Sequence, residues 1–247
     1  MSGHSKWHNI RLRKGKQDAE RGKIFTKLAR EIIVAARTGG GNPDSNIRLR
    51  LAVQKARENS MPADNIKRAI QRGTGELEGQ SFEEVTYEGY GPGGVGIIVS
   101  CLTDNKNRTY PEIRNIFSKT GGRMAETGAV SWSFDQRGLI SVSREGTTED
   151  AVMEAAIEAG AEDVRTEEES FDVITNPGDF EQVRQALETA GLKILNAEVT
   201  MLPQSTLTLT GHEAEVAIRL IETLEDNDDV QNVYTNVDIS DEELAGL

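Results

Sequence analysis

The sequence predicts an α+β protein of three domains: an N-terminal three-helix bundle, a discontinuous α/β middle domain and an inserted ferredoxin-like βαββαβ domain. Three observations predict this architecture. The 247 residues exceed one ordinary domain, which averages roughly 150 residues. The hydrophobic period changes from helical to strand-like near residue 83. Residues 135–204 show the element order β-α-β-β-α-β of a ferredoxin-like fold.

The first domain, residues 1–78, is expected to contain three helices. Apolar residues recur at i, i+3 and i+4 from Asp18, and the glycine run 39–41 ends that first helix. Asn42 is expected to cap a second helix that extends to about residue 59. A third helix follows Pro62 and ends at Gly73. On its outer side lie three cations, Lys67, Arg68 and Arg72.

The middle domain is expected to combine residues 79–134 with residues 205–247. Its first part follows a glycine-rich linker at 73–82 and contains strands 84–90, 95–102 and 129–134 and a helix at 108–119. Its second part contains strands 206–210 and 230–237 around a helix at 213–224. Because this second part cannot bury a core alone, it is expected to return to the sheet that begins near residue 83.

The third domain, residues 135–204, is expected to be inserted between the two parts of the middle domain. Its predicted strands are 138–143, 162–166, 171–176 and 192–201, and its predicted helices are 148–159 and 179–190. Each helix is followed by a glycine, as a left-handed C-terminal cap prefers.

The charge of the chain is strongly asymmetric. Residues 1–72 hold 17 Lys and Arg against 6 Asp and Glu, whereas the rest holds 11 against 35, for a net charge of −13. A polyanion would bind the basic end and be repelled by the acidic body. The alternative is that the basic end simply neutralises the acidic body of the same chain.

The sequence offers little for catalysis or for cofactors. The G-x-G-x-x-G at 91–96 leads into a strand rather than a helix, so it is interpreted as a hairpin turn and not as a dinucleotide site. Cys101 is the one cysteine of the chain, so an internal disulfide is excluded. It lies in an apolar run typical of a hydrophobic core. His4 and His8 have an i, i+4 spacing, but no Cys or further His lies nearby in the sequence to complete a zinc site. We therefore expect no catalytic residues, no metal, no cofactor and no small-molecule substrate.

No apolar run is long enough to span a bilayer, and no apolar region follows the basic start, so we expect a cytoplasmic protein with no membrane partner. The candidate nucleic-acid contacts lie at the basic end, where cations neutralise phosphates and a Trp can stack on a base. They are Lys6, Trp7, Arg11, Arg13, Lys14, Lys16, Arg21, Lys23, Lys27 and Arg30. The alternative for Trp7 is packing against the helical bundle.

Five segments resemble the YebC/PmpR family, which includes a mitochondrial translational activator of cytochrome oxidase subunit I: GHSKWHNIRLRK, DAERGKIFTKLAREI, TGGGNPDSN, YEGYGPGGVG and TDNKNRT. The resemblance implies a cytoplasmic, non-enzymatic regulator with a helical N-terminal domain and two α/β domains. Bacterial members of this family are described as transcriptional regulators that bind promoter DNA. Other members act in translation at the ribosome and ease the synthesis of proline-rich stretches.

The sequence and this resemblance together predict a nucleic-acid-binding regulator of gene expression, with DNA-binding transcriptional regulation first. One alternative is a ribosome-associated translation factor that binds RNA. Another is a protein-interaction module whose basic end docks on an acidic partner, and the acidic α/β body could itself contact a protein. The basic end shows no clear helix-turn-helix reader, which favours recognition of backbone and shape over recognition of base sequence.

Overall fold

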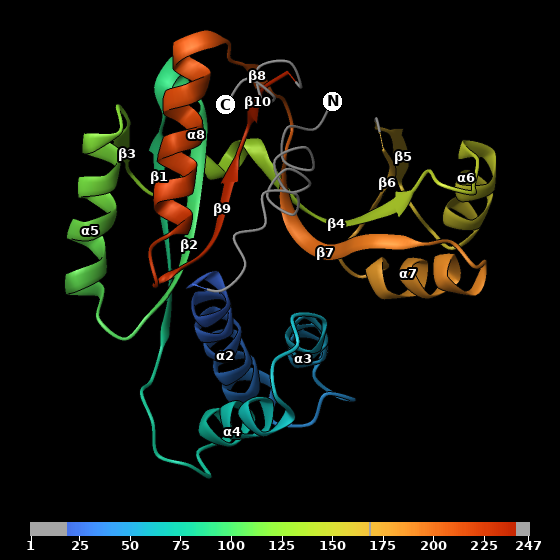
Figure 1. Ribbon diagram of the computed structural model, residues 1–247, viewed down its shortest axis with the longest axis horizontal. Coiled ribbons are helices and arrows are strands. Elements are labelled where there is room, and N and C mark those ends of the chain that lie inside the picture. The colour runs from blue at the N-terminus through green and yellow to red at the C-terminus, as the bar shows by residue number, and fades with distance from the viewer. Residues whose placement is uncertain (1–18, 168, 241–247) are drawn as a thin grey trace.

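The computed structural model describes residues 19–167 and 169–240, and they form a helical unit and two α/β units (Figure 1). This mixed architecture confirms the predicted α+β fold class. None of the described helices is long and apolar enough to cross a membrane. The predicted limits of the three domains stay a prediction.

The helical unit contains α2 (Ala19–Gly39), α3 (Ile47–Glu58) and α4 (Ala63–Thr74). Its core is built from apolar residues of all three helices, including the fully buried Ile32 and Leu49. Phe82 and Leu102, from the segment after α4 and from the middle unit, complete the same core. The helical unit therefore shares its hydrophobic core with the middle unit.

Gly73 lies inside α4 and does not end it, so its predicted role as a C-terminal cap was wrong. The helix continues to Thr74, and Gly75 caps it with a left-handed φ of 83°. A Cβ atom at Gly73 would lie 2.4 Å from the carbonyl oxygen of Ile33 and 2.7 Å from Cβ of Ala36. The glycine is required because the backbones of α4 and α2 approach closely there.

Asn46 caps α3, so the prediction of Asn42 as the cap was also wrong. The Asn46 side chain accepts a hydrogen bond from the Leu49 N–H at 3.0 Å and donates to Ala35 O and Gly40 O, both at 2.8 Å. Residues 42–45 form a turn instead of a first helical turn. The buried Asn46 ties the end of α2 to the start of α3, a contact between helices that local sequence does not indicate.

The middle unit is a four-stranded antiparallel sheet in the order β3-β1-β2-β9. The strands are β1 (Glu83–Tyr90), β2 (Gly96–Thr103), β3 (Arg123–Ala125) and β9 (Val230–Thr235). The helices α5 (Lys106–Lys119) and α8 (Gly211–Glu225) share one core with the sheet. Because β9 pairs with β2, the C-terminal part of the chain returns to this sheet, as expected.

The segment predicted as strand 206–210 does not join that sheet. It forms β8 (Leu207–Thr208), which pairs in parallel with β10 (Val237–Asp238) as a separate two-stranded sheet. Asn236 explains the interruption between β9 and β10, because its side chain accepts a hydrogen bond from the Gly96 N–H at 2.8 Å. The Leu207 N–H then donates to Asn236 O at 2.8 Å and starts the second pairing.

The predicted strand 129–134 is a turn that a buried carboxylate holds. Glu88, 3% exposed, accepts hydrogen bonds from the N–H groups of Gly128 at 2.8 Å, Val130 at 2.6 Å and Ser131 at 3.0 Å. These N–H groups cannot pair with a neighbouring strand, so the chain forms the short 3-10 helix η2 (Ser131–Ser133) before a strand begins at Phe134.

The inserted unit has the strand order β5-β6-β4-β7, with every neighbouring pair antiparallel. Its elements are β4 (Phe134–Ser143), α6 (Glu149–Glu158), β5 (Asp163–Thr166), β6 (Ser170–Thr175), α7 (Phe180–Thr189) and β7 (Ile194–Pro203). This is the predicted βαββαβ arrangement, with both helices packed into one core with the sheet. The chain enters through β4 and leaves through β7, which pair with each other from Phe134 and Pro203 onward.

Replacing Gly73 with Ala should lower the free energy of unfolding by about 1–3 kcal/mol, because the added methyl group meets a backbone carbonyl that cannot move alone. Urea unfolding followed by circular dichroism measures the change. The matched control is Gly22→Ala in α2, where an added Cβ would meet no described atom within 4 Å outside the neighbouring backbone of α2, and alanine should stabilise the helix by about 0.5–1 kcal/mol. Equal effects at the two glycines would contradict the close approach.

Replacing Glu88 with Gln should destabilise the protein at neutral pH by about 1–3 kcal/mol, because an amide cannot accept all three N–H groups. Burial raises the pKa of Glu88, but the hydrogen bonds from Gly128, Val130 and Ser131 outweigh it and leave the pKa lowered. The ionised form therefore stabilises the fold above the usual Glu pKa, and this stabilisation is lost as the pH falls through the folded-state pKa.

The difference in unfolding free energy between wild type and Glu88→Gln should accordingly shrink on acidification below about pH 4, near the unfolded pKa of Glu. Urea titrations over a series of pH values measure it. The exposed Glu126 supplies a control, and Glu126→Gln should change stability little at any of these pH values.

Candidate nucleic-acid interface

The predicted contact residues fall into two groups. Lys6, Trp7, Arg11, Arg13, Lys14 and Lys16 lie outside the described residues, as does the side chain of Arg21. Lys23, Lys27 and Arg30 lie along α2 at helical spacing. The structure brings these last three together against a single segment of the middle unit, residues 225–229, which we term the acidic turn.

The two lysines contact the acidic turn where α8 ends. Lys23 Nζ lies 3.3 Å from the carbonyl oxygen and 3.4 Å from Oδ1 of Asp226. Lys27 Nζ donates to the carbonyl oxygen of Glu225 at 2.5 Å. The end of a helix carries partial negative charge on its last carbonyl groups, so cations are stabilised at this position even without a carboxylate.

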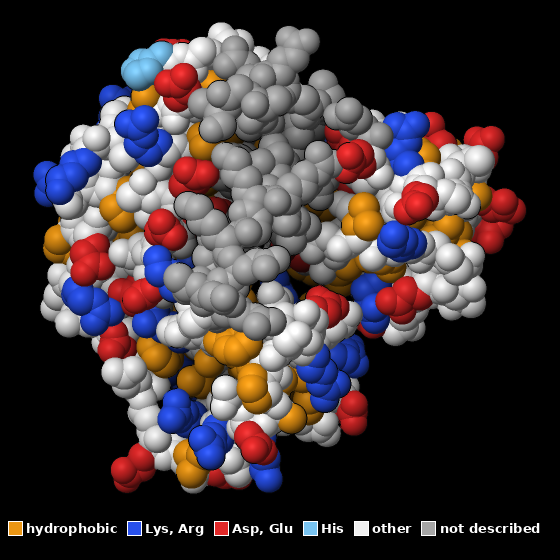
Figure 2. Space-filling model, in the orientation of Figure 1, with side chains coloured by type: hydrophobic (Ala, Val, Ile, Leu, Met, Phe, Trp, Pro, Cys, Tyr) orange, Lys and Arg blue, Asp and Glu red, His pale blue; other side chains and the backbone are white. Residues whose placement is uncertain are grey.

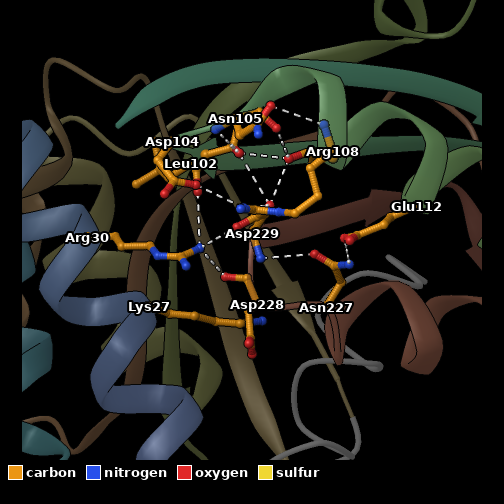
Figure 3. Close-up of polar contacts among 12 residues, drawn as sticks. Lys27, Arg30, Leu102, Asp104, Asn105, Arg108, Glu112, Asn227, Asp228 and Asp229 are labelled. Atoms are coloured by element: carbon orange, nitrogen blue, oxygen red, sulfur yellow. Dashed lines mark hydrogen bonds and ion pairs between the residues drawn. The ribbon is translucent and has the colours of Figure 1, made fainter. Parts of the chain in front are cut away.

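Arg30 makes the deepest contact, with Asp229 (Figure 3). Its guanidinium NH1 donates to Asp229 Oδ1 at 2.8 Å, to Asp228 O at 2.5 Å and to Leu102 O at 3.2 Å. The guanidinium also lies over the ring of Phe82, 5.0 Å from its centroid. The side chains of Arg30 and Asp229 are only 14% and 4% exposed, so this ion pair is largely shielded from solvent.

The second oxygen of Asp229 is also fully engaged. Oδ2 accepts hydrogen bonds from Arg108 NH2 at 2.8 Å and from Thr109 Oγ1 at 2.7 Å. Burial raises the pKa of Asp229, but the bonds from Arg108, Thr109 and Arg30 outweigh it, so the pKa lies below its usual value. Asp229 therefore stays ionised at neutral pH and joins α2 to α5 and to the start of β9.

A polar cavity of about 360 Å³ lies beside this ion pair. Its lining includes two arginines and four carboxylates, namely Arg30, Arg108, Asp104, Glu112, Asp228 and Asp229. Since carboxylates outnumber arginines, the cavity is poorly suited to a phosphate. Among the residues that the structure describes, no group of three or more His, Cys, Asp or Glu side chains could hold a metal ion.

The accessible cations of the helical unit lie on a different face. Among the described residues, four exposed cations of α3 and α4 form no ion pair, and we term them the α3–α4 basic surface: Arg57, Lys67, Arg68 and Arg72. Ile66 and Ala69 anchor α4 in the core, which turns the cations between them outward. Lys and Arg side chains are visible over the helical unit in the lower part of Figure 2.

The expected contact residues did not include the α3–α4 basic surface. The signal was present, because the helical phase places Lys67, Arg68 and Arg72 opposite the apolar stripe of α4. Only one acidic residue, Asp64, lies on this helix. The cations of α2 satisfy the same sequence criteria, and only the tertiary contacts separate the paired set from the free set.

Comparison with known proteins gives matches over nearly the whole chain. A family model described as the N-terminal domain of TACO1/YebC proteins matches residues 5–76, and one described as the TACO1/YebC second and third domain matches residues 82–237. A "Probable transcriptional regulatory protein" of Pelotomaculum thermopropionicum is 56% identical over 98% of this chain and 100% of its own length. A relative of the same description from Geobacter sulfurreducens is 57% identical over 100% of both chains.

A solved structure shares the fold. The crystal structure of a conserved hypothetical protein from Aquifex aeolicus matches with a TM-score of 0.82 and 46% sequence identity, covering 92% of this chain and 96% of that one. The similarity therefore extends across the helical and both α/β units.

Replacing Asp229 with Asn should lower the free energy of unfolding by about 3 kcal/mol, because it leaves the buried Arg30 guanidinium without its anionic partner. The control Asp226→Asn removes a carboxylate that is 76% exposed and that, among the described residues, pairs with Lys23, so it should cost less than about 1 kcal/mol. Urea unfolding distinguishes the two. If the Asp229 variant lost no more stability than the control, Asp229 would not be the joint between these units.

Proposed function

This chain belongs to the TACO1/YebC family, and on that premise we propose that it is a nucleic-acid-binding regulator of transcription with no catalytic activity of its own. Relatives that share more than half of its residues over their full length are named as probable transcriptional regulatory proteins. This role would place the protein in the cytoplasm, where bacterial DNA and ribosomes lie.

The α3–α4 basic surface carries this proposal. Its four cations are exposed, form no ion pair within the described residues and lie on a unit that is basic within an acidic chain. Lys and Arg side chains of this kind neutralise backbone phosphates and release condensed counterions, which drives association. The acidic α/β units would keep a bound polyanion on the helical unit by repulsion.

The N-terminal cations are part of the same proposal on their charge alone. Lys6, Arg11, Arg13, Lys14 and Lys16 would add phosphate contacts, and Trp7 would stack on an exposed base or pack on the bundle. The acidic α/β body would also attract a protein partner with a basic surface.

A second candidate is RNA on the ribosome, which would make the protein a translation factor. Three exposed side chains of α4 are cations, whereas Asn65 is its one exposed amide that could contact base edges. Such a surface recognises backbone and shape, which RNA offers as well as DNA does. Sedimentation of the protein with ribosomes after DNase treatment would favour this candidate, whereas DNase-sensitive retention with the nucleoid would favour DNA.

Replacing Lys67, Arg68 or Arg72 with Ala should weaken binding to a short DNA duplex whatever its sequence. Each loss of a phosphate contact should reduce the slope of log affinity against log salt concentration by about one unit. Fluorescence anisotropy of a labelled duplex over a range of KCl concentrations measures both quantities.

The matched control is the pair Arg114→Ala and Lys119→Ala on α5, two exposed cations outside the helical unit. They should change affinity and slope much less, and equal losses would refute a localised surface. A promoter bound by the regulator should exceed a random duplex by about 10³-fold in affinity; equal binding would leave backbone recognition without sequence-specific regulation.

A further inference from the structure

The α2 cations that the sequence predicts as phosphate contacts bind another segment of the same chain, the acidic turn. Lys23, Lys27 and Arg30 lie at i, i+4 and i+7, and each donates to a carbonyl or carboxylate oxygen of the acidic turn. The turn offers negatively polarised oxygens in succession along its backbone, which is also what a nucleic-acid backbone offers to a row of cations.

We propose that the acidic turn is an intramolecular competitor for nucleic acid, which holds Lys23 and Lys27 until a polyanion displaces it. The inference rests on the proposed function, because it adds a second, covered surface to the nucleic-acid interface. Binding at α2 and docking of the turn are mutually exclusive, so each weakens the other by the same factor.

The contacts differ in strength along α2. The Lys23–Asp226 pair has side chains that are 48% and 76% exposed, so solvent and salt screen it. Arg30 and Asp229 are 14% and 4% exposed and share further hydrogen bonds with the middle unit. A polyanion therefore displaces the turn from Lys23 first, while Arg30 and Asp229 keep the units joined.

In the sequence, Lys23 and Lys27 follow shortly after the most basic segment of the chain. The cations Lys6 to Lys16 precede α2 directly, and Lys23 lies in the second turn of that helix. A nucleic acid held by the preceding cations is confined near Lys23 by the covalent chain, so its local concentration at Lys23 and Lys27 is high. Phosphates of the nucleic acid that is already bound can then replace the acidic turn at these lysines without a second bimolecular encounter.

The experiment removes negative charge from the acidic turn and leaves the cations of α2 unchanged. The double variant Asp226→Asn and Asp228→Asn changes two exposed carboxylates and should bind a short DNA duplex about threefold or more tightly than wild type. Its slope of log affinity against log salt should be steeper, because Lys23, freed from the Asp226 carboxylate, contacts a phosphate. The matched control, Glu154→Gln and Glu158→Gln, makes the same change in net charge on the exposed face of α6.

A gain limited to the turn variant would support competition, whereas an equal gain in the α6 control would show only a general charge effect and overturn it. Hydrogen exchange in the wild-type protein provides a second readout. Addition of the duplex should slow amide exchange in α4 and accelerate it in residues 225–230, where the turn is released.

These readouts separate the inference from the proposed function. Protection of α4 with no change at residues 225–230 and no gain in the turn variant would leave the proposed function standing and overturn competition. Tight binding by the turn variant with an unprotected α4 would support competition and overturn the α3–α4 basic surface. Absence of duplex and RNA binding in both wild type and turn variant would overturn both.

Discussion

The buried carboxylate of Asp229 is the constraint on which the arrangement of the units depends. It accepts hydrogen bonds from Arg30 of the helical unit and from Arg108 and Thr109 of α5, and it directly precedes β9 in the chain. An ionised carboxylate that is 4% exposed is tolerated only with such partners, because desolvation would otherwise cost several kcal/mol. The partners must therefore meet at this point, which fixes α2 against the sheet.

This packing of α2 against the middle unit determines which cations of the helical unit form ion pairs within the chain. The charge asymmetry of the sequence has two interpretations: contact with a polyanion, or neutralisation of the chain's own acidic body. The structure divides the cations between them. Those of α2 pair with the acidic turn, whereas Arg57 and the outer cations of α4 stay free among the described residues. The α2 cations therefore neutralise the acidic body of the same chain, whereas the α3–α4 basic surface remains available for a polyanion.

The errors in the predicted elements share one cause. Asn46, Gly73 and Glu88 each contact a partner that is distant along the chain: the end of α2, the backbone of α2 and the turn at residues 128–131. Local preferences point elsewhere, because Asn42-Pro43 resembles a helix start, Gly73 a helix end and residues 129–134 a strand. Tertiary hydrogen bonds and the close approach of two backbones determine the structure at these positions instead. Neither can be predicted from neighbouring residues alone.

The sequence by itself determined the order and type of nearly all the helices and strands, the ferredoxin-like insertion, the return of β9 to the first sheet and the concentration of positive charge in the N-terminal quarter. Periodicity and charge are properties of neighbouring residues, so they can be read along the chain. Only the tertiary structure decided which cations are free. Lys23, Lys27 and Arg30 look like phosphate ligands in sequence, yet Arg30 pairs with a carboxylate 199 positions away. Such pairing follows from how two units pack, and no local pattern encodes it.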